Sequence, residues 1–225
     1  MATTAQESGE GFAAWFRDRV AALGERSPCA IDGAWVPTEF RRAAVLMPFW
    51  LEGDRLQTLL TVRTQHVSSH KGQISFPGGR RDPDDHSLAD TALRESWEEV
   101  SIEPSSVRLL GALDDAWSVG RYLVTPYVGW LDAPPRLVHA PSEIDRLIVA
   151  DVQRLMEPHR HHRTEMQRGP LTFVMHAFDY DGDIVWGLTG ALLAALFGFV
   201  RTGVVDLAAN GEQGMRGWLQ TRDPE

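Results

Sequence analysis

The sequence predicts an α/β protein of the α+β type, an α/β/α sandwich in which a mixed sheet lies between helices. Apolar runs of strand length alternate with helix-length segments, a glycine-containing turn joins the first two runs, and 43% of the 225 residues are hydrophobic. A chain of this size can bury one sizeable core. We expect one domain over residues 36–203, an N-terminal helical extension over 1–35 and a C-terminal tail over 204–225.

The first half of the chain supplies a helix, a hairpin and a second helix. Residues 11–23 carry an apolar stripe at helical spacing, and residues 43–51 and 56–63 read as two strands joined by a glycine-containing turn. A third strand at 73–76 leads into Gly78 and Gly79. The second helix begins near Ser87, whose hydroxyl can cap it, with Asp90 three residues later.

The second half continues with strands and closes with a helix. Strands are predicted at 107–113, 122–131, 143–152 and 171–180, and a helix at 188–200. The loop 114–121 lies between two predicted core strands, which is a good place for substrate contacts. Residues 208–217 contain three glycines and little apolar periodicity, so a loosely ordered tail is expected there.

Composition argues against several functional classes. A net charge of −9 with no long basic run works against binding nucleic acid. The single cysteine, Cys29, cannot form an internal disulfide and has no motif of a catalytic nucleophile around it. The start lacks a secretory pattern, and the most apolar window, 185–200, is too short and glycine-rich for a membrane span. We expect a cytoplasmic protein with no membrane partner.

The helix after Gly79 carries the most informative residues of the chain. Glu95, Glu98 and Glu99 fall within one arc of the helix, beside Arg94. Glutamates on a helix usually form a solvated face, but here they follow two glycines that permit a close backbone approach. Clustered carboxylates suit Mg²⁺ or Mn²⁺, which bind through a few carboxylates together with substrate phosphates. The pattern therefore predicts a divalent-cation site.

These residues resemble the signature box of the Nudix hydrolase family, which reads Gly, five residues, Glu, seven residues, Arg-Glu-apolar-any-Glu-Glu-any-Gly-apolar. The sequence has one more residue between Gly79 and Arg94 than the standard box, and its central acidic position is Asp84 or Asp85. Ser96 and Ser101 replace the usual small apolar residue and glycine.

The segment before the box is similar to the coenzyme A pyrophosphatase branch of that family. Residues 59–63 read Leu-Leu-Thr-Val-Arg, and residues 70–79 read His-Lys-Gly-Gln-Ile-Ser-Phe-Pro-Gly-Gly. The lengthened acidic loop before Thr-Ala-Leu-Arg-Glu also fits this branch, and the likeness spans roughly residues 42–200. The resemblance implies hydrolysis of coenzyme A or an acyl-CoA to 4′-phosphopantetheine, or its acyl form, and adenosine 3′,5′-bisphosphate.

The resemblance also implies roles for individual residues. Glu95, Glu98 and Glu99 would hold Mg²⁺ or Mn²⁺ together with the carbonyl of Gly79, and Arg94 would orient Glu95. The general base would be Glu95 or Glu143, with Asp115 in reserve. Phosphates of the substrate would meet five basic side chains: Arg63, His70, Lys71, Arg80 and Arg81.

Several alternatives stay open. The same machinery could hydrolyse another nucleoside diphosphate derivative, such as ADP-ribose or a dinucleotide, or the chain could be a non-catalytic nucleotide sensor. Trp117, Tyr122 and Trp130 could stack an adenine, although large aromatics near strands more often belong to the core. Residues 159–163 contain three histidines, and an exposed turn is expected there rather than a metal site. A homodimer is also compatible with the sequence.

Overall fold

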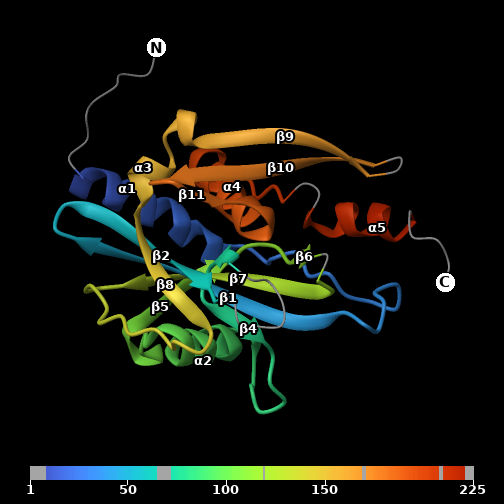
Figure 1. Cartoon of the computed structure of the whole chain (residues 1–225), viewed down its shortest axis with the longest axis horizontal. Coiled ribbons are helices and arrows are strands. Elements are labelled where there is room, and N and C mark those ends of the chain that lie inside the picture. The colour runs from blue at the N-terminus through green and yellow to red at the C-terminus, as the bar shows by residue number, and fades with distance from the viewer. Residues whose placement is uncertain (1–8, 65–71, 119, 169–170, 208–209, 221–225) are drawn as a thin grey trace.

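The computed structural model describes residues 9–64, 72–118, 120–168, 171–207 and 210–220. Within these ranges the main body is an eight-stranded mixed sheet (Figure 1). Its strands are β1 (Arg41–Glu52), β2 (Arg55–Arg63), β3 (Ile74–Ser75), β4 (Gly78–Arg80), β5 (Val107–Ala112), β6 (Ala116–Ser118), β7 (Tyr122–Leu131) and β8 (Ile144–Asp151).

The long central strand β1 organises this sheet. It pairs antiparallel with β2 and β4 and parallel with β7, so the sheet is mixed as predicted. The predicted hairpin forms, with Gly53 in the turn at a φ of +63°, a conformation that glycine adopts without steric cost. On its other edge β2 pairs with β8, which places Arg63 opposite Ile144.

Helices cover both faces of the sheet, which confirms the predicted α/β/α sandwich (Figure 1). Helix α2 (Leu88–Val100) covers one face and shares a core cluster with Ala44, Leu46 and Trp50 of β1. Helices α1 (Gly9–Ala21) and α4 (Gly187–Thr202) cover the other face, where Phe16 packs 5.0 Å from Phe49 between ring centroids. Short helical turns complete the chain: η1 (Ala22–Glu25), η2 (Pro104–Ser106), α3 (Val152–Leu155) and η3 (Pro158–Arg160).

The apolar window that ends the domain forms α4. Most of its residues are buried, including Leu193 and Leu196, because it packs between the main sheet and a second sheet. A helix that is apolar on nearly every side is expected in such an interior position. In the part of the chain that the structure describes, no helix is both long and apolar enough to cross a membrane.

A second, three-stranded antiparallel sheet was not predicted. It consists of β9 (His161–Arg168), β10 (Leu171–Tyr180) and β11 (Asp183–Val185), in the order β11-β10-β9. Only β10 was predicted as a strand. The exposed turn expected at residues 159–163 is right for 159–160 and wrong for 161–163, which begin β9. The ring of His161 stacks on Phe178 at 4.5 Å and shares a hydrogen bond of 2.8 Å with His176. Pairing with β10 extends this polar segment into a strand.

The expectation of a loosely ordered tail is wrong for residues 212–220. These residues form helix α5 (Glu212–Gln220), in which Met215 is fully buried against Ile31 and Trp117. Arg216 also pairs with Glu212 one turn earlier, at 2.8 Å. The glycines of this segment suggested disorder, but Met215 and Leu219 form a short apolar stripe that packs against the segment around Ile31.

Loop 114–121 was predicted to face substrate, but its acidic residues bind the chain's own N-terminal segment. Asp114 accepts hydrogen bonds from Arg26 and from the amide of Cys29. Asp115 is buried and accepts from Arg42 at 2.8 Å and from the amide of Ile31. Because Thr125 also donates to Asp115, this carboxylate is fully engaged, and its reserve assignment as a general base is wrong.

Both ends of α2 follow the expected local rules. The hydroxyl of Ser87 accepts from the amide of Asp90 at 3.1 Å and donates to the Asp90 carboxylate, as in a capping box. Ser101 ends the helix in the left-handed conformation, with φ 60° and ψ 30°. Its hydroxyl donates to the carbonyl of Val138 at 3.2 Å. Serine therefore occupies a position that usually favours glycine.

We predict that Ser101→Val lowers the free energy of unfolding by about 1–2 kcal/mol, because a β-branched residue is strained in the left-handed region. Ser101→Gly should be tolerated, since relief of strain offsets the lost hydrogen bond to Val138. Urea unfolding of both variants measures the difference. Equal stability of the valine and glycine variants would contradict the strain argument.

Candidate active site

Two glycines of β4 bring the backbone against the glutamates of α2. A Cβ atom on Gly79 would lie 2.5 Å from Cδ of Glu95, so only glycine leaves room for that carboxylate. Gly78 has a φ of +151°, and its amide donates to Oε2 of Glu99 at 3.1 Å. The register Ala44↔Gly79 between β1 and β4 fixes this approach.

The carboxylates of Glu95 and Glu99 are removed from water. Glu99 is 5% exposed, and the side chain of Glu95 is 18% exposed. Burial raises the pKa of Glu99 to about 7, against the opposing effects of the Gly78 amide and Arg63. Burial also raises the pKa of Glu95, although Arg94 opposes the shift. The hydrogen bonds and charges around both carboxylates therefore stabilise their ionised forms less than water would.

Arg94 links these glutamates to the acidic loop before α2. Its guanidinium contacts both carboxylate oxygens of Asp85, at 2.9 and 3.0 Å, and also reaches Glu95 at 3.1 Å and Glu98 at 3.0 Å. The Arg94 guanidinium holds the pKa of Asp85 well below its usual range. Asp85 is buried whereas Asp84 is exposed, so Asp85 is the partner of Arg94.

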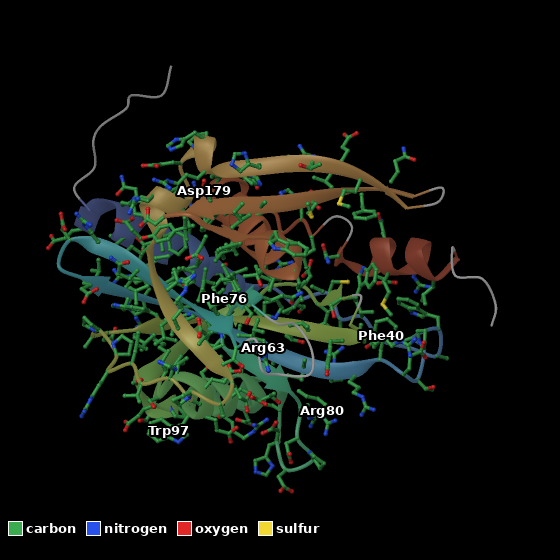
Figure 2. The ribbon with its side chains drawn as sticks, viewed as in Figure 1. Phe40, Arg63, Phe76, Arg80, Trp97 and Asp179 are labelled. Atoms are coloured by element: carbon green, nitrogen blue, oxygen red, sulfur yellow. The ribbon has the colours of Figure 1, made fainter. Side chains whose placement is uncertain are left out.

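Arg63, at the end of β2, also approaches Glu99 (Figure 2 labels Arg63). Its Nη1 lies 3.7 Å from Oε1 of Glu99, and its Nη2 lies 3.7 Å from Oε2 of Glu143. The pairing of β2 with β8 brings Glu143 here, since the amide of Thr64 donates to the carbonyl of Glu143 at 2.9 Å. Two residues predicted from distant parts of the sequence therefore meet at the glutamates of α2.

The donor set fits a hard divalent cation. The buried carboxylate of Glu99 and the half-buried carboxylate of Glu95 lie beside a glycine backbone and are oxygen ligands that such a cation would stabilise. Glu98 lies apart from them, with its side chain 55% exposed and bound to Arg94. Among the residues that the structure describes, no three His, Cys, Asp or Glu side chains are arranged to hold a metal ion without further ligands. The ligand roles of Glu95, Glu98, Glu99 and Gly79 therefore stay predictions.

Comparison with known proteins identifies the family. The family model described as "NUDIX domain" matches residues 40–175. The chain belongs to the Nudix family. The protein named "Uncharacterized Nudix hydrolase NudL" from Yersinia pestis (strain Pestoides F) is 37% identical over 156 residues, which cover 69% of this chain and 78% of the relative. The protein of the same name from Yersinia pseudotuberculosis serotype O:1b (strain IP 31758) matches equally. The expectation of a Nudix hydrolase is thus confirmed.

Solved structures show more distant likeness. An Ap4A hydrolase from C. elegans is 19% identical, with a TM-score of 0.42, and the match covers 50% of this chain and 81% of that one. The NUDIX domain of Shewanella oneidensis NrtR, solved in complex with ADP ribose, is 18% identical, with a TM-score of 0.43 and coverage of 54% and 79%. At this level of similarity the matches say nothing of the substrate.

The remaining predicted site residues lie in different places. Arg80 and Arg81 are exposed next to the Nudix glycines, whereas His70 and Lys71 lie outside the described residues. Trp117 and Trp130 are buried, which favours their core interpretation over adenine stacking. Sequence reasoning missed Arg41 and Arg42, which share a hollow with Arg80 and Arg81. Their adjacency at the start of a predicted strand was the only signal, because the pairing of β1 with β4 was unknown.

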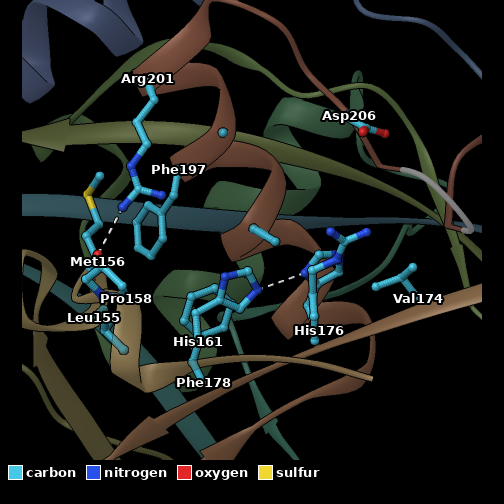
Figure 3. A pocket seen from close by; sticks show the side chains of 13 residues that line it. Leu155, Met156, Pro158, His161, Val174, His176, Phe178, Phe197, Arg201 and Asp206 are labelled. Atoms are coloured by element: carbon cyan, nitrogen blue, oxygen red, sulfur yellow. Dashed lines mark hydrogen bonds between the residues drawn. The ribbon is translucent and has the colours of Figure 1, made fainter. Parts of the chain in front are cut away.

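A larger cavity, of about 600 Å³, lies away from the Nudix glutamates between the second sheet and α4 (Figure 3). His161 and His176, on the paired strands β9 and β10, both line it and share a hydrogen bond, and Phe178 and Phe197 form part of its apolar wall. Arg201, also in the lining, donates to the carbonyl of Met156 at 2.9 Å. None of the site residues predicted from the sequence lines this cavity.

We predict that Asp85→Asn lowers the free energy of unfolding at pH 7 by about 3 kcal/mol, because it leaves Arg94 without its bidentate partner. The lowered pKa of Asp85 means that wild type has this stabilisation above the unfolded-state pKa and loses it as pH falls toward the folded-state pKa. The difference between wild type and variant should therefore shrink below about pH 4.

Urea unfolding at pH 7 and pH 3 measures this difference, with Asp84→Asn as the matched control. The control changes an exposed neighbour in the same loop and should leave stability unchanged. If both variants lose the same stability, Asp85 is not the anchor of Arg94.

Proposed function

We propose that this Nudix protein is a metal-dependent pyrophosphohydrolase that cleaves the diphosphate of coenzyme A or an acyl-CoA. The products would be 4′-phosphopantetheine, or its acyl form, and adenosine 3′,5′-bisphosphate. The observation that carries the proposal is the contact of Arg63 with Glu99 and Glu143. Arg63 belongs to the Leu-Leu-Thr-Val-Arg segment that resembles the coenzyme A branch, and this segment lies at the buried glutamates.

A diphosphate resists hydrolysis because its negative oxygens repel a nucleophile, so the site has to offset that charge. Glu95, Glu98, Glu99 and the carbonyl of Gly79 would hold Mg²⁺ or Mn²⁺. Such an ion supplies Lewis-acid polarisation of phosphoryl oxygens and lowers the pKa of water. The proposal is supported by the buried Glu99 and the half-buried Glu95, because keeping their carboxylates ionised away from water is unfavourable unless a cation lies beside them.

The arginines would have different tasks. Arg94 is engaged by Asp85, Glu95 and Glu98, so it would position the glutamates of α2. Arg63 contacts its two glutamates only at 3.7 Å, so its guanidinium has donors left for a phosphate oxygen. Arg80 and Arg81 are exposed beside the glycines and would meet phosphates of the substrate. His70 and Lys71 keep the same role as predictions from the sequence.

Of the two candidates for the general base, we favour Glu143. Glu95 is packed against Gly79, and its Oε1 is paired with Arg94 at 3.1 Å, so the carboxylate is held in a position suited to a ligand rather than to a base. The side chain of Glu143 is 54% exposed and faces the buried glutamates across Arg63. A base has to be accessible to the water that it deprotonates. Glu143 would accept that proton while Glu95 serves as a ligand.

The setting of the enzyme is proposed from composition. A net charge of −9 disfavours nucleic acid as a partner, so the partner would be a small nucleotide. The single cysteine is compatible with a reducing compartment, and we propose a cytoplasmic location. Self-association into a homodimer stays a prediction.

Activity on a substrate panel tests the proposed function. With Mn²⁺ and coenzyme A, ADP-ribose or diadenosine polyphosphates, we expect coenzyme A to be consumed fastest when products are followed by chromatography. Faster hydrolysis of ADP-ribose or of a dinucleotide would show that the proposed substrate is wrong. If the protein hydrolyses none of these compounds, a nucleotide sensor is favoured.

Glu99→Gln tests the metal assignment. We expect kcat/KM to fall by more than about a hundredfold, since even partners of metal ligands can contribute that much. Thermal stability at pH 8 should be equal or higher, because the variant removes a buried charge. Glu103→Gln, just beyond the helix and exposed, is the control. Unchanged activity of Glu99→Gln would contradict the assignment.

Glu143→Gln tests the general base. We expect kcat to fall by about 10²–10⁴-fold with KM nearly constant, because loss of a general base affects the chemical step. Activity of the variant should rise with pH as hydroxide replaces the base, and Mn²⁺ affinity measured by calorimetry should match wild type. A larger loss in Glu95→Gln with retained Mn²⁺ affinity would transfer the role to Glu95.

A further inference from the structure

Four arginines surround one shallow hollow beside the Nudix glycines. Arg41 and Arg42 come from the start of β1, Arg80 from the end of β4, and Arg81 from the residue that follows. The hollow has a volume of about 400 Å³, and Asp82 and Pro83 complete its lining. The chain has 22 lysines and arginines and a net charge of −9, so a cluster of four arginines is unusual for an acidic protein.

Two of these arginines are held in place by the fold. Arg42 donates to Asp115 at 2.8 Å and to Thr125 at 3.1 Å. Arg81 donates to the carbonyl of Asp85 at 3.0 Å. These bonds fix two walls of the hollow before any ligand arrives, which lowers the cost of binding.

The other two arginines have unused donors. Among the described residues, the guanidinium groups of Arg41 and Arg80 have no hydrogen-bond or ion-pair partner. Guanidinium groups match phosphate oxygens with paired N–H donors, and several of them together suit a doubly charged anion. The hollow therefore has the chemistry of a site for a phosphomonoester.

Backbone pairing places this hollow next to the active site. Arg80 directly follows Gly79, against which Glu95 packs, and its carbonyl accepts from Arg94 at 3.2 Å. The register Ala43↔Arg80 continues the register Ala44↔Gly79 along β1 (Figure 2 shows Arg80 near the loop before α2). Since a strand rises about 3.3 Å per residue, a ligand at the glutamates lies close to the hollow.

We propose that this hollow binds a phosphomonoester that the substrate carries close to its diphosphate, at the 3′ position of the ribose. This inference rests on the proposed function, because coenzyme A has a 3′-phosphate separated from its diphosphate only by the ribose. Arg41 and Arg80 bind the phosphate directly, and Arg42 and Arg81 form the fixed walls. The hollow thereby distinguishes coenzyme A from nucleotides that lack this group.

The test compares coenzyme A with dephospho-coenzyme A, which differs only in the 3′-phosphate. For Arg41→Ala, which removes an arginine of the hollow that has no proposed role at the diphosphate, we expect KM for coenzyme A to rise by about ten- to a hundredfold, the loss of hydrogen bonds to a charged group. Kinetics on dephospho-coenzyme A should match wild type. Arg108→Ala, an exposed arginine of β5 near Asp132, is the control. An equal loss on both substrates, or no loss, would overturn the inference.

A binding experiment separates this inference from the proposed function. If wild type hydrolyses neither substrate, the proposed function fails, and calorimetry with adenosine 3′,5′-bisphosphate and AMP still tests the hollow. We expect wild type to bind the bisphosphate more tightly than AMP, and Arg41→Ala to lose most of this difference. Equal affinity of wild type for the two nucleotides would overturn the inference.

Discussion

The close approach of β4 to α2 is the constraint on which the site depends. Gly79 leaves the space that the Glu95 carboxylate occupies, and the amide of Gly78 bonds Glu99. A side chain at either position would collide with its neighbours, since the nearest atoms to a Cβ on Gly78 belong to the backbone of Ala44 and Val45. The glycines thus allow one buried and one half-buried carboxylate to lie between a helix and a strand.

Two arginines, Arg94 and Arg63, lie next to the carboxylates of Glu95 and Glu99. A buried charge without a partner of opposite charge destabilises the folded state. The carboxylates at this site therefore need positively charged neighbours. The guanidinium of Arg94 donates to both carboxylate oxygens of Asp85, so its side chain is fixed in one position. Arg63 makes only longer contacts to Glu99 and Glu143. The site is therefore rigid on the side of α2 and adaptable on the side of β2, where substrate and cation would add to it.

Local patterns were sufficient to predict one half of this arrangement. The helix, its Ser87 cap and the glutamates at 95, 98 and 99 depend on short-range spacing, which the sequence displays directly. The hairpin of β1 and β2 was predictable for the same reason. Ser101 shows the limit of such patterns, because its left-handed conformation is stabilised by a hydrogen bond to distant Val138.

Contacts between distant segments could not be predicted from local patterns. Helix α5 is ordered by packing of Met215 on Ile31, and β9 becomes a strand only through its pairing with β10. Asp115 appeared suitable as a base, yet Arg42 and the amide of Ile31 enclose it. The choice between Asp84 and Asp85 likewise required knowledge of which carboxylate faces Arg94.

The strand β1 connects the candidate active site to the arginine hollow. It pairs with β4 over residues 43–45, so a single register sets both the contact of Gly79 with Glu95 and the position of Arg80 beside Arg41. A slip of one residue would turn every side chain of the strand to the opposite face. Two features hold that register. β1 pairs in parallel with β7 along ten residues, and the face of β1 that carries Ala44 is buried against α2. The glutamates and the arginine hollow are therefore positioned by one element, and a substrate that spans both meets a preformed surface.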